Sequence, residues 1–287
     1  VAEERAGDGN DSAPLDPHEL VEEALIPLGN APLLLYPLLR LEDLFGLSGM
    51  QSVALACGSE EEARAVRHWV DRRYAAHPSR PHVLAITEQD LALAELGSGG
   101  SGSGSGAPWS QVSARIVAQA FHQGLGSEFD LAENVIVMHG NLVSDVQLEA
   151  VVAAHRLRRA TATVVLSRPS KEKQEDLLKS KSKAPKTFVG LAPGDAAQLC
   201  LWASERGSNM KVLPNGKREQ LKTLQVPRKV LKKLSHVNIS SNLVDTDLGV
   251  FKREVFDGST VAQLGLASIP GDLIPHLVKE QFQDQAT

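Results

Sequence analysis

The sequence predicts an α/β fold: a Rossmann-like, mostly parallel sheet flanked by helices, with a small antiparallel extension. Three observations lead to this prediction. Short apolar runs alternate with one-sided helical patterns over residues 29–167, which is the rhythm of right-handed βαβ units. Residues 135–138 are apolar at every position, as in a parallel strand buried on both faces. Two strand-like runs, 187–192 and 196–204, flank a Pro-Gly-Asp turn and predict an antiparallel hairpin.

The first elements are expected as a helix, a strand and a second helix. Residues 29–46 read as a helix with Pro32 in its first turn and a kink at Pro37. A strand is expected at 51–57. Ser59 and Glu62 then form a capping box. The helix that follows carries a one-sided apolar stripe: Ala63, Val66, Val70 and Tyr74.

The middle of the chain repeats this order. Residues 82–86 predict a strand, and Val112, Ile116, Val117 and Ala120 mark an amphipathic helix. After the apolar strand at 135–138, Ser144 is expected to cap a helix over 145–159, with Gln147 completing the box. Its arginines, Arg156, Arg158 and Arg159, suit the negative C-terminal end of a helix.

The last part of the chain alternates again. A strand is expected at 161–167, and residues 242–256 predict a strand that runs into a helix. The chain closes with an amphipathic helix at 271–282.

Length and composition allow one large α/β domain or two smaller ones, because 287 residues with 42% hydrophobic side chains can bury a large core, and we expect a single domain over residues 1–287. Three segments are set apart by composition. Residues 97–106 contain only Gly and Ser and predict a flexible loop, whether natural or engineered. The lysine-rich stretches 168–186 and 204–233 are interpreted as solvated basic insertions.

Charge and cysteine content exclude several classes of protein. A net charge of −5 argues against a nucleic-acid-binding protein, so no direct nucleic-acid partner is expected. Cys57 and Cys200 follow apolar runs and suit reduced thiols of a cytoplasmic protein. No run approaches the roughly 20 apolar residues of a membrane span, and the acidic start does not resemble a signal peptide.

Strong catalytic motifs are missing from the sequence, which contains no GxSxG, HExxH, Walker lysine motif or paired CxxC. The early stretch Ala-Gly-Asp-Gly-Asn-Asp, with Gly7 and Gly9, could place backbone N–H groups around a phosphate. Because no clear strand precedes it, an ordinary exposed loop is the preferred interpretation.

The end of the strand at 135–138 is the place where ligands bind in open α/β sheets, and His139, Gly140, Asn141 and Asp145 follow it. A lone His139 without an orienting carboxylate favours a structural role. Asp145, directly after the expected cap, is attributed to the helix dipole rather than to a metal.

Two further groups of residues are candidates for chemistry. His155 is expected at the surface near the helix end, among arginines. Asp245 and Asp247 are expected to share one strand face, which would allow a second metal carboxylate or a solvent-facing edge.

The residues quoted above also carry a family resemblance. Residues 24–58 and 135–166 resemble the nucleotide-sugar pyrophosphorylases, in which a Lys-Pro-Leu-Leu-Pro-like segment, a Gly-Asn turn and a strand with a Gly-Asp turn occur in this order. Residues 188–193, 240–257 and especially 271–282 resemble the gamma subunit of the eukaryotic initiation factor that exchanges guanine nucleotide on the GTPase carrying initiator tRNA. The epsilon subunit of that factor is the nearest alternative. The resemblance implies a fold of the nucleotide-diphospho-sugar transferase type.

The departures from active pyrophosphorylases imply a pocket without chemistry. Where that family has a basic residue on the phosphates and a lysine before its Leu-Leu-Pro segment, this sequence has the Gly7–Gly9 loop and Glu23. The metal aspartate corresponds to Asn141, whose amide brings no charge to hold Mg²⁺. A carboxylate facing a triphosphate is also repelled by it. The resemblance therefore implies a vestigial nucleotide pocket formed by Gly7, Gly9, Glu23, Asn141 and Asp145, with no catalytic residue, metal or cofactor.

The implied function is that of a non-catalytic subunit that supports GDP-for-GTP exchange through contacts. Its expected partners are the epsilon subunit, the other subunits of the exchange complex and the GTPase. The rival is an active sugar-1-phosphate nucleotidyltransferase of the mannose-1-phosphate guanylyltransferase type. It would need Lys171 or Arg168 on the triphosphate, and Asp145 with Asp245 or Asp247 on the metal. A third alternative is a sensor that binds GTP without turnover through Gly7 and Gly9, so residual GTP or Mg²⁺ binding stays open.

Overall fold

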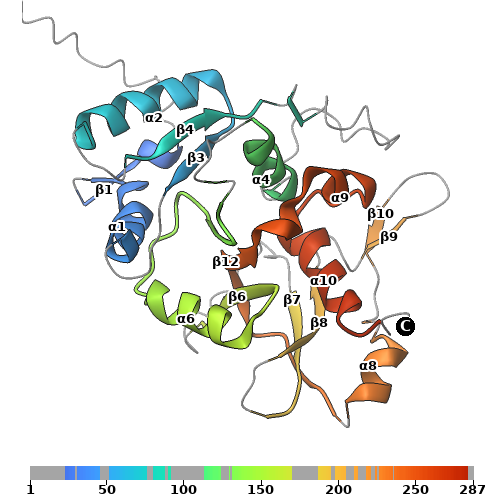
Figure 1. The fold of residues 1–287 in the computed structure, drawn as a ribbon. Helices are drawn as coiled ribbons and strands as arrows, with labels where there is room; N and C mark the ends of the chain where they lie inside the picture. The colour runs from blue at the N-terminus through green and yellow to red at the C-terminus, as the bar shows by residue number, and fades with distance from the viewer. Residues whose placement is uncertain are drawn as a thin grey trace, which may run out of the picture.

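The computed structural model describes most of the chain between residues 23 and 283 (Figure 1). The described residues are 23–29, 31–45, 52–75, 80–87, 90–91, 113–123, 129, 131–169, 187–194, 198–204, 210–212, 218–220, 224, 226–234 and 236–283. Gly7, Gly9, Lys171 and the Gly/Ser tract 97–106 lie outside these residues. The same is true of 170–186 and of parts of 204–233, so both basic insertions are described only in part.

The N-terminal elements begin with a short hairpin and a helix. They are η1 (Glu23–Leu25), β1 (Pro27–Leu28), β2 (Ala31–Pro32) and α1 (Leu35–Phe45). β1 and β2 pair antiparallel, so the prediction that Pro32 opens the helix was wrong. Pro37 is the third helical residue rather than the site of a kink. A proline there removes no helix hydrogen bond, because N–H groups of the first turn have no intrahelical partner.

The βαβ unit that follows is confirmed. It consists of β3 (Ala54–Cys57), α2 (Glu60–Arg73) and β4 (His82–Ala85), and β3 and β4 pair in parallel. Ser59 caps α2, since its Oγ accepts from Glu62 N at 3.0 Å, and Glu62 Oε2 accepts in return from Gly58 N at 2.6 Å. The predicted apolar stripe is buried at every position: Ala63, Val66, Val70 and Tyr74.

The central sheet corrects the prediction of mostly parallel pairing. Its strand order is β5-β12-β6, formed by β5 (Asn134–Met138), β12 (Val244–Lys252) and β6 (Ala162–Ser167). β12 pairs antiparallel with both neighbours, so β5 and β6 run in the same direction without touching as strands. Within the described residues, β3 and β4 form the parallel pair. A continuous apolar run indicates burial on both faces, but it does not fix the direction of a strand that arrives a hundred residues later.

The helix after β5 begins later than predicted. α6 (Leu148–Arg158) has Gln147 at its N-cap, and no side chain caps it. Ser144 Oγ instead accepts from Val146 N at 3.1 Å, which closes a local turn before the helix. Asp145 therefore lies in a loop and not in the first helical turn, so the explanation by the helix dipole was wrong. Arg159 ends the helix in the left-handed conformation, with φ of 48°.

The antiparallel extension is confirmed. β7 (Thr187–Leu191) pairs antiparallel with β8 (Leu199–Ser204) and with β11 (Asn238–Ser240). β9 (Met210–Val212) and β10 (Arg218–Gln220) form a separate antiparallel pair. The basic stretch ends in the short helix α8 (Arg228–Lys233).

The C-terminal helices complete the larger core. They are η3 (Arg253–Phe256), α9 (Gly258–Gln263), η4 (Ile269–Leu273) and α10 (Ile274–Glu280), and they pack near α4 (Ser113–His122). Phe256 and Leu273 of these helices, with Phe251 of β12, are among the most deeply buried side chains of this core. A second core joins α1, α2 and β3 through Leu44, Val66 and their neighbours.

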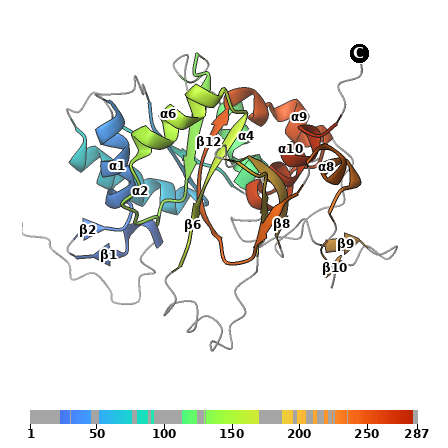
Figure 2. The ribbon, with the colours of Figure 1, turned by 90° about the horizontal axis from the view of Figure 1, so that it is seen from below.

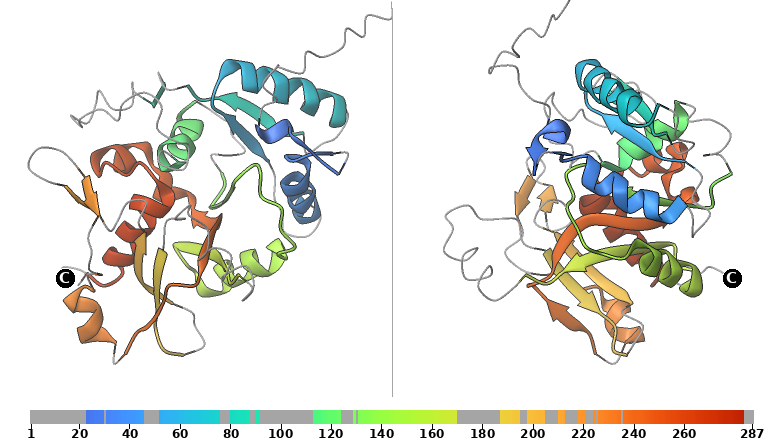
Figure 3. Two further views of the ribbon diagram at one scale, coloured as in Figure 1. Left: turned by 180° about the vertical axis from the view of Figure 1, so that it is seen from behind. Right: turned by 90° about the vertical axis from the view of Figure 1, so that its left-hand side faces the viewer.

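Figure 1 places α1, α2, β3 and β4 at one side of the molecule and α8, α9 and α10 at the other, with β12 between them. The view from below in Figure 2 and the view from behind in Figure 3 show the same division. The structure is thus a mixed α/β arrangement of several small sheets covered by helices. Within the described part of the chain, no helix has the length and hydropathy needed to span a bilayer.

Candidate functional site

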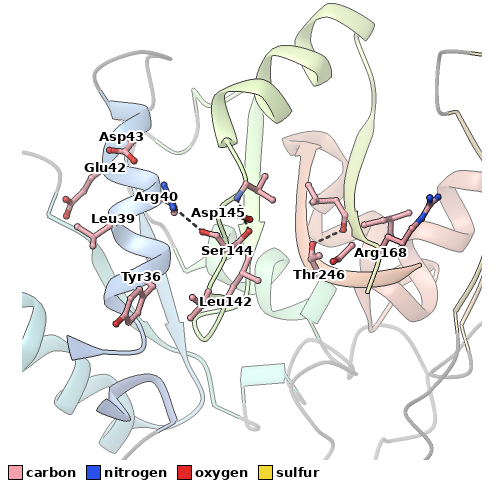
Figure 4. Close-up of a pocket in the computed structure, with 15 residues that line it drawn as sticks. Tyr36, Leu39, Arg40, Glu42, Asp43, Leu142, Ser144, Asp145, Arg168 and Thr246 are labelled. Carbon is pink, nitrogen blue, oxygen red and sulfur yellow. Dashed lines mark hydrogen bonds between the residues drawn. The ribbon is translucent and has the colours of Figure 1, made fainter. Parts of the chain in front are cut away.

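A cleft lies at the carboxyl ends of β5 and β6. It measures about 980 Å³. Because β12 is antiparallel to both strands, its own beginning meets their ends at this edge. The lining residues come from α1, the β5–α6 loop, β6 and β12: Tyr36, Leu39, Arg40, Glu42, Asp43, Leu142, Val143, Ser144, Asp145, Val146, Val165, Leu166, Ser167, Arg168 and Thr246 (Figure 4). The position agrees with the general rule for α/β sheets.

Helix α1 and the β5–α6 loop form one wall of the cleft. Arg40 Nε donates to the carbonyl oxygen of Ser144 at 3.1 Å, which joins the helix to the loop (Figure 4). Tyr36 lies one turn earlier, and its hydroxyl donates to Leu28 O at 2.6 Å. On the far side, Thr246 Oγ1 donates to Val165 O at 2.7 Å. Both walls are therefore held by hydrogen bonds to the backbone.

Charge in the cleft is slightly negative. Two arginines, Arg40 and Arg168, and three carboxylates, those of Glu42, Asp43 and Asp145, line the cleft. The formal net charge of its lining is therefore −1. Glu42 is also engaged with the core, since it accepts a hydrogen bond from the hydroxyl of Tyr74. Burial raises the pKa of Tyr74, and the contact with Glu42 raises it further. A lining of this sign does not attract a nucleoside triphosphate.

The structure describes three of the five residues of the predicted nucleotide pocket, and one of them lines the cleft. Asp145 lines the cleft and is exposed. Asn141 is not among the lining residues, and its Oδ1 lies 2.6 Å from Nδ1 of His139. The backbone of Glu23 belongs to η1, while Gly7 and Gly9 lie outside the described residues. The structure thus brings Asp145, but not Asn141, to the cleft.

No group of three or more His, Cys, Asp or Glu side chains placed to hold a metal ion is found in the part of the chain that the structure describes. The amide oxygen of Asn141 is already in hydrogen-bonding contact with the neighbouring imidazole.

Asp245 and Asp247 do not form the shared face that strand periodicity predicts. β12 shifts register between Asp245 and Gly249, and Asp247 adopts a left-handed φ of 53°. Asp247 N donates to Asp245 Oδ1 at 3.0 Å. The bulge breaks the alternation: the Asp245 carboxylate accepts from the backbone N–H of Asp247, and of these three residues Thr246 lines the cleft.

The rival nucleotidyltransferase hypothesis finds partial support. Arg168 and Asp145, which it requires, line the same cleft. The second carboxylate that it needs, from Asp245 or Asp247, is not among the lining residues. Lys171 lies outside the described residues. The geometry therefore supplies one cation and one carboxylate of the required set.

His155 was misplaced by sequence reasoning. It is buried, with 2% of its surface exposed, rather than at the surface. Its Nδ1 lies 2.9 Å from Thr163 Oγ1, and its Nε2 lies 3.0 Å from Asn134 Oδ1. Burial lowers the pKa of His155, and the nearby Lys252 lowers it further. His155 is thus a neutral structural link between α6, β5 and β6.

Other residues of the cleft were missed by sequence reasoning altogether. Arg40, Tyr36 and Thr246 come from elements up to two hundred residues apart, so no local spacing connects them. The one available signal was the exposed face of the amphipathic α1 pattern, on which Leu39 is 39% exposed.

Comparison with known proteins agrees with the resemblance found in the sequence. No protein-family model matches the chain. The chain is 27% identical over 283 residues to a protein of Schizosaccharomyces pombe named translation initiation factor eIF2B subunit gamma. The matched region is 98% of this chain and 52% of the yeast protein, so the chain spans about half the length of that relative. Over nearly its whole length, the chain is therefore similar to the gamma subunit of translation initiation factor eIF2B.

Proposed function

We propose that this chain is a non-catalytic, nucleotidyltransferase-like domain of an eIF2B gamma subunit. It would support exchange of GDP for GTP on the GTPase that carries initiator tRNA, by binding other subunits of the complex. The observation that carries the proposal is the similarity to an eIF2B gamma subunit over 98% of the chain. A Rossmann-like layout of the nucleotide-diphospho-sugar transferase type and a cytoplasmic location are parts of the same proposal.

The chemistry of the cleft supports the non-catalytic part of this proposal. Its lining carries more carboxylates than arginines, and the amide of Asn141 contacts His139 rather than lining the cleft. A nucleotidyltransferase needs an excess of positive charge in its cleft, because its metal and its cationic side chains must offset the negative charge of a triphosphate. We therefore expect no cofactor, and any nucleotide binding to be weak.

An apolar surface at the rim of the cleft supports the binding part of the proposal. Leu39 on α1 and Val143 in the β5–α6 loop line the cleft and are 39% and 54% exposed. Ile26 and Leu28, in the segment that contacts Tyr36, are 43% and 45% exposed. Apolar side chains gathered in this way are typical of surfaces that another protein covers. We assign this surface to the epsilon subunit.

The experiment is co-purification of the chain with the epsilon subunit, followed by measurement of the dissociation constant. The double substitution Leu39→Asp with Val143→Asp should weaken binding at least tenfold, because about 1.4 kcal/mol is lost when carboxylates enter an apolar interface. Leu264→Asp is the matched control, since Leu264 is 48% exposed after α9 and does not line the cleft. Equal binding by all three proteins would contradict the assignment of this surface.

A further inference from the structure

A second groove is lined by residues of β8, α8 and α10 and of the segments next to them. Figure 1 shows these three elements near one another in the C-terminal part of the molecule. The groove measures about 500 Å³ and shares no residue with the cleft described above. Fourteen residues line it: Cys200, Leu201, Trp202, Ala203, Val226, Pro227, Arg228, Lys229, Val230, Pro275, Val278, Lys279, Phe282 and Gln283. None of the fourteen is acidic.

The floor of the groove is apolar and fixed. Cys200, Val230 and Phe282 pack together as one buried cluster. Trp202 is also buried, and its Nε1 donates to Pro270 O at 2.7 Å. These buried side chains fix the shape of the recess, and the half-buried Val226 and the exposed Pro227 contribute accessible apolar surface to its lining.

The rim of the groove is cationic. Arg228 and Lys229 rise from α8, Lys279 rises from α10, and all three are exposed. The nearest carboxylate along α10, that of Glu280, lies 3.4 Å from Nε2 of His276 and does not line the groove. Three cations around an apolar floor complement an occupant that carries carboxylates on both sides of an apolar residue.

The groove suits a peptide better than a nucleic acid or a membrane. Single-stranded nucleic acid needs exposed rings on which bases stack, whereas Trp202 and Phe282 are only 4% and 5% exposed. A bilayer is bound by apolar side chains that project outward, and here the apolar atoms lie at the bottom of a recess.

We propose that this groove binds an acidic peptide segment of a partner protein. An apolar side chain of that segment enters the recess beside Val226 and Pro227, above the buried cluster of Cys200, Val230 and Phe282. Its flanking carboxylates pair with Arg228, Lys229 and Lys279. This binding site is independent of the proposed role in the exchange complex, because it uses neither the cleft nor the surface assigned to the epsilon subunit.

The test uses a fluorescein-labelled peptide with a central Leu-Phe pair flanked by Asp and Glu residues, and measures its binding to the chain by fluorescence anisotropy. The triple substitution Arg228→Glu, Lys229→Glu and Lys279→Glu should weaken binding about tenfold or more, since it replaces three attractive contacts by repulsive ones. The matched control is Lys232→Glu with Lys233→Glu. Both lysines lie on α8 and do not line the groove, so this control should bind nearly as well as the wild type.

A second peptide separates the groove from general attraction between charges. In that peptide Ser-Ser replaces Leu-Phe, and it should bind about tenfold more weakly if the apolar floor contributes. Three results would overturn the proposal: no binding of the first peptide, equal binding of both peptides, or equal weakening by the triple variant and its control. Tighter binding of an oligo-dT strand than of the acidic peptide would also overturn it, in favour of a nucleic-acid surface.

Discussion

At the scale of single residues, the burial of His155 makes the stability of the folded chain depend on pH. Burial lowers its pKa from 6.5 in the folded chain. Above about pH 6.5 the imidazole is neutral in both states and this contribution is fully present. As the pH falls through 6.5, the imidazole binds a proton in the unfolded state but not yet in the folded state. Stability is therefore lost as the solution becomes acidic, until the folded pKa is reached.

The variant His155→Gln tests this account by urea unfolding at about pH 7.5 and about pH 5.5. We expect it to be less stable than the wild type at the higher pH, by about 1–3 kcal/mol, because hydrogen bonds to Thr163 and Asn134 are disturbed. We also expect the variant to lose less stability than the wild type when the pH falls from the higher to the lower of these two values. His68→Gln, at an exposed site of α2, is measured in parallel as the control for the removal of a histidine. An unchanged loss in His155→Gln would show that other groups cause it.

Gly190 illustrates a close approach that only glycine permits. A Cβ atom there would lie 2.6 Å from Leu201 Cβ and 3.0 Å from Val237 Cγ1. We expect Gly190→Ala to lower the free energy of unfolding by about 1–3 kcal/mol, because neither neighbour is a flexible chain end. Gly258→Ala is the control, since a Cβ meets nothing within 4 Å at the start of α9. The two substitutions should differ clearly in urea midpoint, and equal midpoints would contradict the packing argument.

At the scale of elements, two serines that look alike in the sequence behave differently. Both Ser59 and Ser144 precede a helical pattern with Glu or Gln three residues later. Ser59 caps α2, whereas Ser144 closes a turn three residues before the N-cap of α6. We expect Ser59→Ala to lower stability by about 1 kcal/mol and Ser144→Ala by about half of that or less, as measured by thermal or urea unfolding. The reverse order would mean that Ser144 supports its helix more strongly than the geometry indicates.

The elements also show which features can be predicted from one sequence. The stripe of α2 and its capping box are local, because residues three or four positions apart meet on one helix face, and both were predicted correctly. The direction of β12 relative to β5 and β6 depends on a strand a hundred residues away, and it was not predicted. His155 lies between these cases. Leu148, Val152 and His155 are spaced as one buried helix face, but the arginines beside His155 suggested a surface position.

At the scale of the whole molecule, the sequence predicted where the cleft lies but not what encloses it. The carboxyl end of β5 was the expected position, and Asp145 and Arg168 were among the candidates. The remaining walls are formed by α1 and by the bulged start of β12, which no periodicity in the sequence connects. Strand alternation predicts that Asp245 and Asp247 share one face of β12. The bulge breaks that alternation around Thr246.

The central claim is that this chain works through its surfaces and not through chemistry in its cleft. The most direct measurement is pyrophosphate release by the purified chain, with GTP or ATP, Mg²⁺ and mannose 1-phosphate, and with calorimetric binding of the same nucleotides in parallel. The account predicts no pyrophosphate above a protein-free blank and no micromolar binding, because the cleft carries three carboxylates against two arginines. Pyrophosphate release that Asp145→Asn or Arg168→Ala abolishes would contradict it and identify an active nucleotidyltransferase.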